Sequence, residues 1–138
     1  MREALKEAQK AFDKDEIPIG AVIVADNKII ARAHNLTETL NDVTAHAEMQ
    51  AITAAANFIG GKYLTDCTLY VTIEPCVMCA GAIAWSHISK IVYGAVETKK
   101  GFSVLDKSLL HPKTTVLKGI LAQDCEKIMK DFFVKKRK

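Results

Sequence analysis

The segment Glu74-Pro75-Cys76-Val77-Met78-Cys79 directly follows residues 68–73, a run of β-branched and aromatic side chains. Such a run predicts a strand, and Pro75 suits the first turn of a helix, where its missing N–H costs no hydrogen bond. Cys76 and Cys79 are three residues apart and would share one helix face, near free N–H groups that favour thiolates. A strand that leads straight into a helix bearing two thiols predicts an α/β fold.

A C-x-x-C pair alone is compatible with a thioredoxin-like redox site, a structural metal site or no special role. The segment Thr44-Ala45-His46-Ala47-Glu48 narrows the choice. One histidine and two cysteines can bind zinc, and three protein ligands leave the fourth position for water, as in catalytic sites. Glu48 could then move protons during hydrolysis at an amidine-like carbon and pass one to departing ammonia. A redox protein would give His46 and Glu48 no role.

It is harder to explain how His46 and Glu48 could face the same site. Residues i and i+2 diverge in the middle of a helix, so His46 and Glu48 can converge only near a helix start. Asp42 is a suitable N-cap, which puts His46 in the first turn of a helix over residues 43–58. Because two thiolates would neutralise the charge of Zn²⁺, its water would be less acidic than at an all-histidine site. A dedicated proton acceptor such as Glu48 would therefore be useful.

Elsewhere the chain alternates between helix-like and strand-like segments. Helices are predicted over residues 2–14, 43–58, 76–85 and 121–134. Strands are predicted over residues 19–25, 28–33, 68–73, 90–95 and 114–117. Residues 96–112 show no clear pattern. This order predicts one domain over residues 1–138, a three-layer α/β/α sandwich with a mixed, roughly five-stranded sheet.

The composition is ordinary for a soluble globular protein, since 49% of the 138 residues are hydrophobic and 25% are charged. No run approaches the roughly 20 apolar residues of a membrane span, and the N-terminus lacks a signal-peptide core. We therefore expect a cytoplasmic protein without membrane contact, in which Cys67 and Cys125 are reduced core residues. Residues 121–138 account for the whole net charge of +3. Such a basic tail is commonly a solvated end, but it can also contact phosphates.

The two motifs together match H-x-E followed by P-C-x-x-C, the known signature of zinc deaminases that act on nucleobases. On these residues the chain resembles the cytidine-deaminase-like superfamily. Over nearly its whole length it resembles the bacterial tRNA adenosine deaminases, through residues 17–24, 44–48, 69–82 and 131–133. The resemblance implies a cytidine-deaminase-like fold, one Zn²⁺ per chain and hydrolytic conversion of adenosine to inosine at the wobble position of a tRNA anticodon.

The resemblance also implies roles for individual residues. The zinc ligands would be His46, Cys76 and Cys79, and Glu48 would be the proton shuttle. The residues that would bind the flipped-out nucleoside are Asn35, Ile17, Ala47 and Ile73. Those that would contact the anticodon stem-loop are Phe133, Lys136 and Arg137. The family is homodimeric and binds tRNA across both subunits, and the mostly apolar helix over residues 76–85 would suit that interface.

Simpler roles exist for several of these residues. Asn35 could be a turn residue, Ile17 and Ile73 could belong to the core, and Phe133 could close an amphipathic helix face. The segment Lys99-Lys100-Gly101-Phe102-Ser103 also departs from a more glycine-rich loop in the family.

Residues 66–67 and 82–85 resemble the related guanine deaminases. The alternative function is therefore deamination of free guanine, or of cytosine, for which a phosphate-contacting tail has no use. A zinc or RNA-binding module without catalysis is a third interpretation, and it leaves Glu48 without a role.

Overall fold

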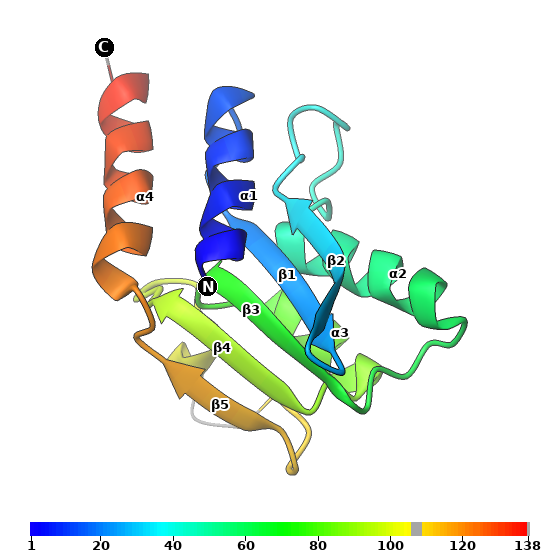
Figure 1. The fold of residues 1–138 in the computed structure, drawn as a ribbon. Coiled ribbons are helices and arrows are strands. Elements are labelled where there is room, and N and C mark those ends of the chain that lie inside the picture. Colours follow the sequence, from blue (N-terminus) through cyan, green and yellow to red (C-terminus); the bar gives the residue numbers. More distant parts are fainter. Residues whose placement is uncertain (106–108, 138) are drawn as a thin grey trace.

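The computed structural model describes residues 1–105 and 109–137 of the chain. These residues form four α-helices, one short 3₁₀ helix and one five-stranded sheet (Figure 1). The helices are α1 (Arg2–Asp13), α2 (Ala47–Ile59), α3 (Val77–Ser86) and α4 (Ala122–Lys136), with the 3₁₀ turn η1 at Phe102–Val104. The strands are β1 (Gly20–Ala25), β2 (Lys28–His34), β3 (Cys67–Ile73), β4 (Lys90–Ala95) and β5 (Thr115–Lys118).

The sheet lies between two pairs of helices, in the strand order β2-β1-β3-β4-β5 (Figure 1). Helices α1 and α4 cover one face, and α2 and α3 cover the other. Helix α1 crosses the sheet very closely at Gly20, where a Cβ atom would lie 2.0 Å from the carbonyl oxygen of Ala4. The fully buried side chains include Ile23, Leu69 and Ile91 from the adjacent strands β1, β3 and β4, so the core is centred on these three strands, whereas β5 is exposed. The predicted three-layer α/β/α sandwich is confirmed.

The direction of β1 determines where the functional residues gather. Strands β3, β4 and β5 are parallel, whereas β1 runs antiparallel to both of its neighbours. The start of β1 and the ends of β2, β3 and β4 therefore lie at the same edge of the sheet. Residues that precede β1 meet there with residues that follow the other three strands, and helices α2 and α3 begin beside this edge (Figure 1).

Every predicted helix and strand is present, and most observed ends differ from the predicted ends by only one or two residues. The second helix is the exception, because it begins at Ala47 rather than at residue 43, and its N-cap is His46. The prediction of Asp42 as N-cap was wrong. Its carboxylate instead accepts hydrogen bonds from the backbone N–H (2.8 Å) and hydroxyl (2.7 Å) of Thr44, which closes a local turn.

Pro75 does not occupy the first turn of a helix as predicted, since α3 starts at Val77 and Cys76 is its N-cap. The backbone of Cys76 is extended (φ −73°, ψ 174°) and pairs with Gly101 in an isolated β-bridge. This pairing with a distant loop delays the start of the helix. None of the helices in the described part of the chain has the length and apolar character needed to cross a bilayer.

Candidate active site

His46, Cys76 and Cys79 meet at the sheet edge where α2 and α3 begin. The Nδ1 atom of His46 lies 3.7 Å from Sγ of Cys76 and 3.5 Å from Sγ of Cys79. Candidate ligand atoms of all three residues lie within 4.8 Å of one another. His46 and Cys76 are helix N-caps and Cys79 is in the first turn of α3, so both helix dipoles point their positive ends at this group.

This geometry fits a tetrahedral metal ion. With Zn–N bonds of about 2.0–2.1 Å and Zn–S bonds of about 2.3 Å, a tetrahedral site separates nitrogen and sulfur by roughly 3.6 Å. The observed separations agree with that value. The donor set of one imidazole and two thiols is also one that zinc prefers. The three residues can therefore hold a metal ion, and they are the ones that the sequence predicted.

The electrostatics of the three side chains favour binding of a cation. Hydrogen bonds from Cys79 and His46 lower the pKa of Cys76 to about 4, so its thiol is ionised at neutral pH. The hydrogen bond to Cys76 in turn raises the pKa of His46, and the adjacent thiolate raises that of Cys79. One negative charge is thus already present, and a divalent cation would displace the remaining protons.

Glu48 lies beside this group at the start of α2 and is only 3% exposed. Burial raises the pKa of its carboxyl group to about 7. Its Oε1 atom is buried and has no hydrogen-bond partner among the described residues. A buried polar atom without a partner is costly, and here it lies where a metal-activated water and a substrate would supply one. A carboxyl group that titrates near neutrality can both accept and donate a proton.

A pocket of about 370 Å³ opens beside the three candidate metal ligands, here called the metal group. Its volume is within the size range of small-molecule sites. His46, Glu48 and Cys76 line its floor, and the other lining residues come from four segments. These are Ile17, Ile19, Ile73, Glu74, Glu97, Lys99, Lys100, Met129 and Phe133. The pocket thus combines an apolar wall with titratable groups, and two lysines belong to its lining.

The segment of residues 97–103, here called the rim loop, forms one side of this pocket. The carboxylate of Glu74 accepts hydrogen bonds from the backbone N–H of Glu97 (3.1 Å) and of Ser103 (2.9 Å), and from the Ser103 hydroxyl. The carboxylate of Glu97 accepts a bond from the N–H of Lys99 at 2.9 Å. Residues 96–112 have no periodic pattern, so only the family resemblance pointed to a loop at residues 99–103, and the hydrogen bonds that hold it were not predicted.

A second buried carboxylate, Glu16, organises the opposite side of the site. It accepts hydrogen bonds from the backbone N–H groups of Glu38 (3.0 Å) and Thr39 (2.6 Å). Gln50 adds a further link, because its amide donates to the carbonyl groups of His34 (2.8 Å) and Ala45 (3.1 Å). These bonds fix the segments that lead to Asn35 and His46. Sequence reasoning missed Glu16 and Gln50, since neither belongs to a recognisable motif.

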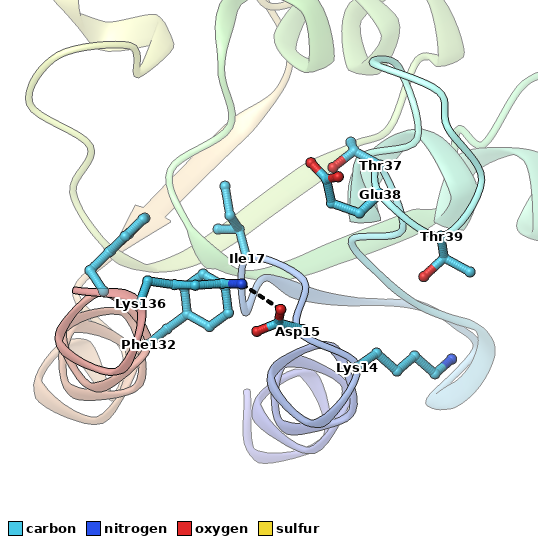
Figure 2. A pocket seen from close by; sticks show the side chains of 9 residues that line it. Lys14, Asp15, Ile17, Thr37, Glu38, Thr39, Phe132 and Lys136 are labelled. Carbon is cyan, nitrogen blue, oxygen red and sulfur yellow. Dashed lines mark hydrogen bonds and ion pairs between the residues drawn. The ribbon is translucent and has the colours of Figure 1, made fainter. Parts of the chain in front are cut away.

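A groove beside the pocket, here called the tail groove, has a volume of about 560 Å³. It is lined by Lys14, Asp15, Ile17, Thr37, Glu38, Thr39, Phe132, Phe133 and Lys136 (Figure 2). Lys136 of α4 forms an ion pair with Asp15 across one end of the groove (Figure 2). Ile17 and Phe133 line both cavities, so the tail groove adjoins the pocket.

The structure brings together most of the residues predicted to contact substrate. Ile17, Ile73 and Phe133 line the pocket, and Lys136 lines the tail groove. Asn35 is buried (4% exposed) just after β2 and belongs to the lining of neither cavity. The side chain of Ala47 is fully buried in the core. Arg137 is the exposed C-cap of α4, beyond the cavity walls.

Comparison with known proteins agrees with this geometry. Residues 1–137 match the family model of MafB19-like deaminases. A tRNA-specific adenosine deaminase of Streptococcus pyogenes serotype M18 (strain MGAS8232) is 49% identical over 138 residues, covering 96% of this chain and 87% of the relative.

Comparison with solved structures also finds deaminases. A structure from a study of A-to-I editing by tRNA:A34 deaminases at the wobble position of transfer RNA superposes with a TM-score of 0.85. It is 41% identical and covers 93% of this chain and 96% of its own. Guanine deaminase from Bacillus subtilis matches with a TM-score of 0.67 and 43% identity, over 70% of this chain and 62% of its own. With a match that spans nearly its whole length, the chain belongs to the MafB19-like deaminase family and is a deaminase.

Proposed function

We propose that this enzyme hydrolytically deaminates adenosine to inosine at the wobble position of a tRNA anticodon. The observation that carries the proposal is the buried Glu48 carboxyl beside the His46, Cys76 and Cys79 group, at the floor of a pocket. Support for the substrate comes from the similar proteins, one named tRNA-specific adenosine deaminase and one studied as a tRNA:A34 deaminase. Such a substrate would be met in the cytoplasm.

We infer that one zinc ion per chain would be held by His46, Cys76 and Cys79. When bound, it would supply Lewis-acid activation of a water molecule at the pocket floor. Glu48 would accept the proton that this water loses as it attacks C6 of the purine. The same carboxyl group would pass that proton to N1 of the purine and then carry the remaining hydroxyl proton to the amino nitrogen, so that ammonia leaves and a carbonyl oxygen remains at C6.

An RNA loop suits this pocket because its target base is already unpaired. Deaminases must take the base out of its stack, and an anticodon loop lowers the cost of that step. The apolar wall formed by Ile17, Ile73 and Phe133 would pack against the flipped-out base. The tail groove and the basic residues at the end of α4, Lys136 and Arg137, would lie along the anticodon stem-loop.

We also propose that the enzyme is a homodimer whose contact surface includes α3. The inner side of that helix is buried, whereas Trp85 is 82% exposed and Val77 46% exposed. On the neighbouring helix α2, Phe58 is 70% exposed. Exposed aromatic residues grouped on adjacent elements are typical of protein–protein contacts.

The experiment that tests the function measures ammonia release from zinc-loaded enzyme with two substrates in parallel. One is an anticodon stem-loop with adenosine at the wobble position, and the other is free guanine. The proposal expects ammonia only from the stem-loop, with inosine appearing at the wobble position. Release only from guanine would overturn it in favour of the second candidate, which the 43% identity to a guanine deaminase makes worth testing.

A further inference from the structure

Glu74 is a buried acidic residue that the proposed chemistry does not use. Its carboxyl group is 2% exposed, directly before Pro75 at the end of β3. One carboxylate oxygen accepts the N–H of Glu97, and the other accepts the N–H and the hydroxyl of Ser103. A single side chain thus binds both ends of the rim loop.

The loop is closed tightly around this carboxylate. A Cβ atom on Gly101 would lie 2.5 Å from Cδ of Glu74 and 2.6 Å from its Oε2 atom. Gly101 also forms the β-bridge with Cys76, and the N–H of Phe102 donates to the carbonyl of Pro75 at 2.9 Å. Only a residue without a side chain allows this approach. The rim loop is therefore held against the segment that carries the metal ligands.

The rim loop carries two positively charged side chains at its turn. Lys99 and Lys100 line the pocket, and the backbone N–H of Lys99 is fixed by the carboxylate of Glu97. Neither lysine forms an ion pair within the part of the chain that the structure describes. A pocket rim with two unpaired ammonium groups attracts phosphate.

We propose that Glu74 is a positioning residue, which holds the rim loop so that Lys99 and Lys100 bind the phosphates that flank the flipped-out nucleotide. This inference rests on the proposed function, since a free base carries no phosphate. A carboxylate suits the role because it only accepts hydrogen bonds, and its two oxygens meet the three donors of the loop. In Glu74→Gln the amide nitrogen would face one of these donors, and one end of the loop would be released.

The test compares five proteins: wild type, Glu74→Gln, the double variant Lys99→Ala/Lys100→Ala, the combination of all three changes, and the control Lys28→Ala/Lys62→Ala. The control lysines are exposed and line neither cavity. For each protein, kcat and KM for the stem-loop are measured at several salt concentrations, together with zinc content. Stem-loop binding is also measured by fluorescence anisotropy.

Removal of the two lysines should raise KM about tenfold for each lost contact, because the free energy of a hydrogen bond to a charged group corresponds to roughly that factor in affinity. The slope of log affinity against log salt should become shallower by about 0.7 per lost contact. Glu74→Gln should reproduce both changes with unaltered zinc content and kcat within about twofold. The combined variant should be no worse than the lysine pair alone, because Glu74 acts through the lysines.

Losses that multiply in the combined variant, or an unchanged salt slope in Glu74→Gln, would overturn the proposal. Hydrogen exchange of the Glu97 and Ser103 amides tests the loop restraint without RNA, and exchange at the wild-type rate in Glu74→Gln would also overturn it. If the wild type bound and deaminated no stem-loop, the proposed function would fail, while hydrogen exchange would still decide whether Glu74 restrains the loop. Should Glu74→Gln not fold, Gly101→Ala displaces the same loop from the other side and must give the same phenotype.

Discussion

His46 and Cys76 hold equivalent positions in two helices, and the Nδ1 atom of one lies 3.7 Å from Sγ of the other. Each is the N-cap of its helix with an extended backbone, and each points its side chain into the space between the two helix starts. Both helix dipoles therefore favour negative charge at one point. Before a metal binds, the Cys76 thiolate supplies that charge, and the arrangement has several measurable consequences.

Zinc content should depend on the metal-binding residues and not on cysteine number. Cys79→Ala should purify with less than one zinc per chain, since it removes a ligand from a three-ligand site. Elemental analysis after dialysis against a chelator measures this. Cys67→Ala is the matched control, because Cys67 is equally buried but lies at the other end of β3. Equal zinc retention in both variants would refute the ligand assignment.

Alkylation of zinc-free protein should select Cys76. Because its pKa is lowered to about 4, the reactive thiolate is already fully formed above pH 5.5, and the rate should stay flat up to pH 8. An ordinary thiol reacts about tenfold faster for each pH unit over that range. Cys125, whose pKa burial raises to about 11, should remain unmodified.

Peptide mapping after timed exposure to iodoacetamide gives the rate at each cysteine. Zinc-loaded protein is the control, and it should be protected at Cys76. A rate at Cys76 that climbs steadily with pH would contradict a lowered pKa.

Glu48→Gln should keep zinc and lose turnover. The amide preserves the shape of the side chain but cannot accept a proton from water, so the rate should fall by about 10²–10⁴, the usual contribution of general acid–base catalysis. Single-turnover assays with the stem-loop measure the rate, and elemental analysis checks the metal. Glu126→Gln, on the exposed side of α4, is the control. Near-normal turnover with bound zinc would remove Glu48 from the mechanism.

The ion pair between Asp15 and Lys136 should compete with RNA for Lys136. In Asp15→Asn the ammonium group is released, so the stem-loop should bind about two- to fivefold more tightly, the modest gain expected when an exposed ion pair no longer competes. Fluorescence anisotropy measures the affinity. In the reciprocal variant Lys136→Ala binding should weaken, and its salt dependence should become shallower. Unchanged binding in both variants would mean that Lys136 does not touch the RNA.

Trp85→Glu should convert a dimer into a monomer. An exposed aromatic residue at the centre of a contact commonly contributes at least about 2 kcal/mol, and a buried negative charge would add repulsion. Light scattering coupled to size-exclusion chromatography measures the mass. Val134→Glu, equally apolar but on α4 of the opposite layer, should leave the mass unchanged. A monomeric wild type would refute the proposed interface.

Much of the fold could be predicted from local pattern, because hydrophobic runs and turn residues identify single elements. The metal group was predictable for the same reason, since His46, Cys76 and Cys79 occur in two short motifs. Helix starts were less predictable. Neither motif shows that Asp42 closes a turn instead of capping α2, or that pairing with Gly101 delays α3 until after Cys76.

The residues that shape the pocket rim could not be predicted because their partners are distant in sequence. Glu74 binds Glu97 and Ser103, which lie 23 and 29 residues away. Glu16 binds the N–H of Thr39 in a loop that carries no motif. A buried acid whose role is to accept backbone hydrogen bonds looks, in sequence, like any other glutamate.

The reversed direction of β1 also determines where the chain can be lengthened. The β1–β2 hairpin turns at Asp26 and Asn27, both with left-handed backbone (φ 52° and 61°), as the tight turns of two-residue hairpins require. Since the start of β1 is at the pocket, this turn lies at the far end of the sheet. A peptide tag or a second domain inserted there would extend away from the pocket, so the hairpin tip is a suitable position for fusion proteins that must keep deaminase activity.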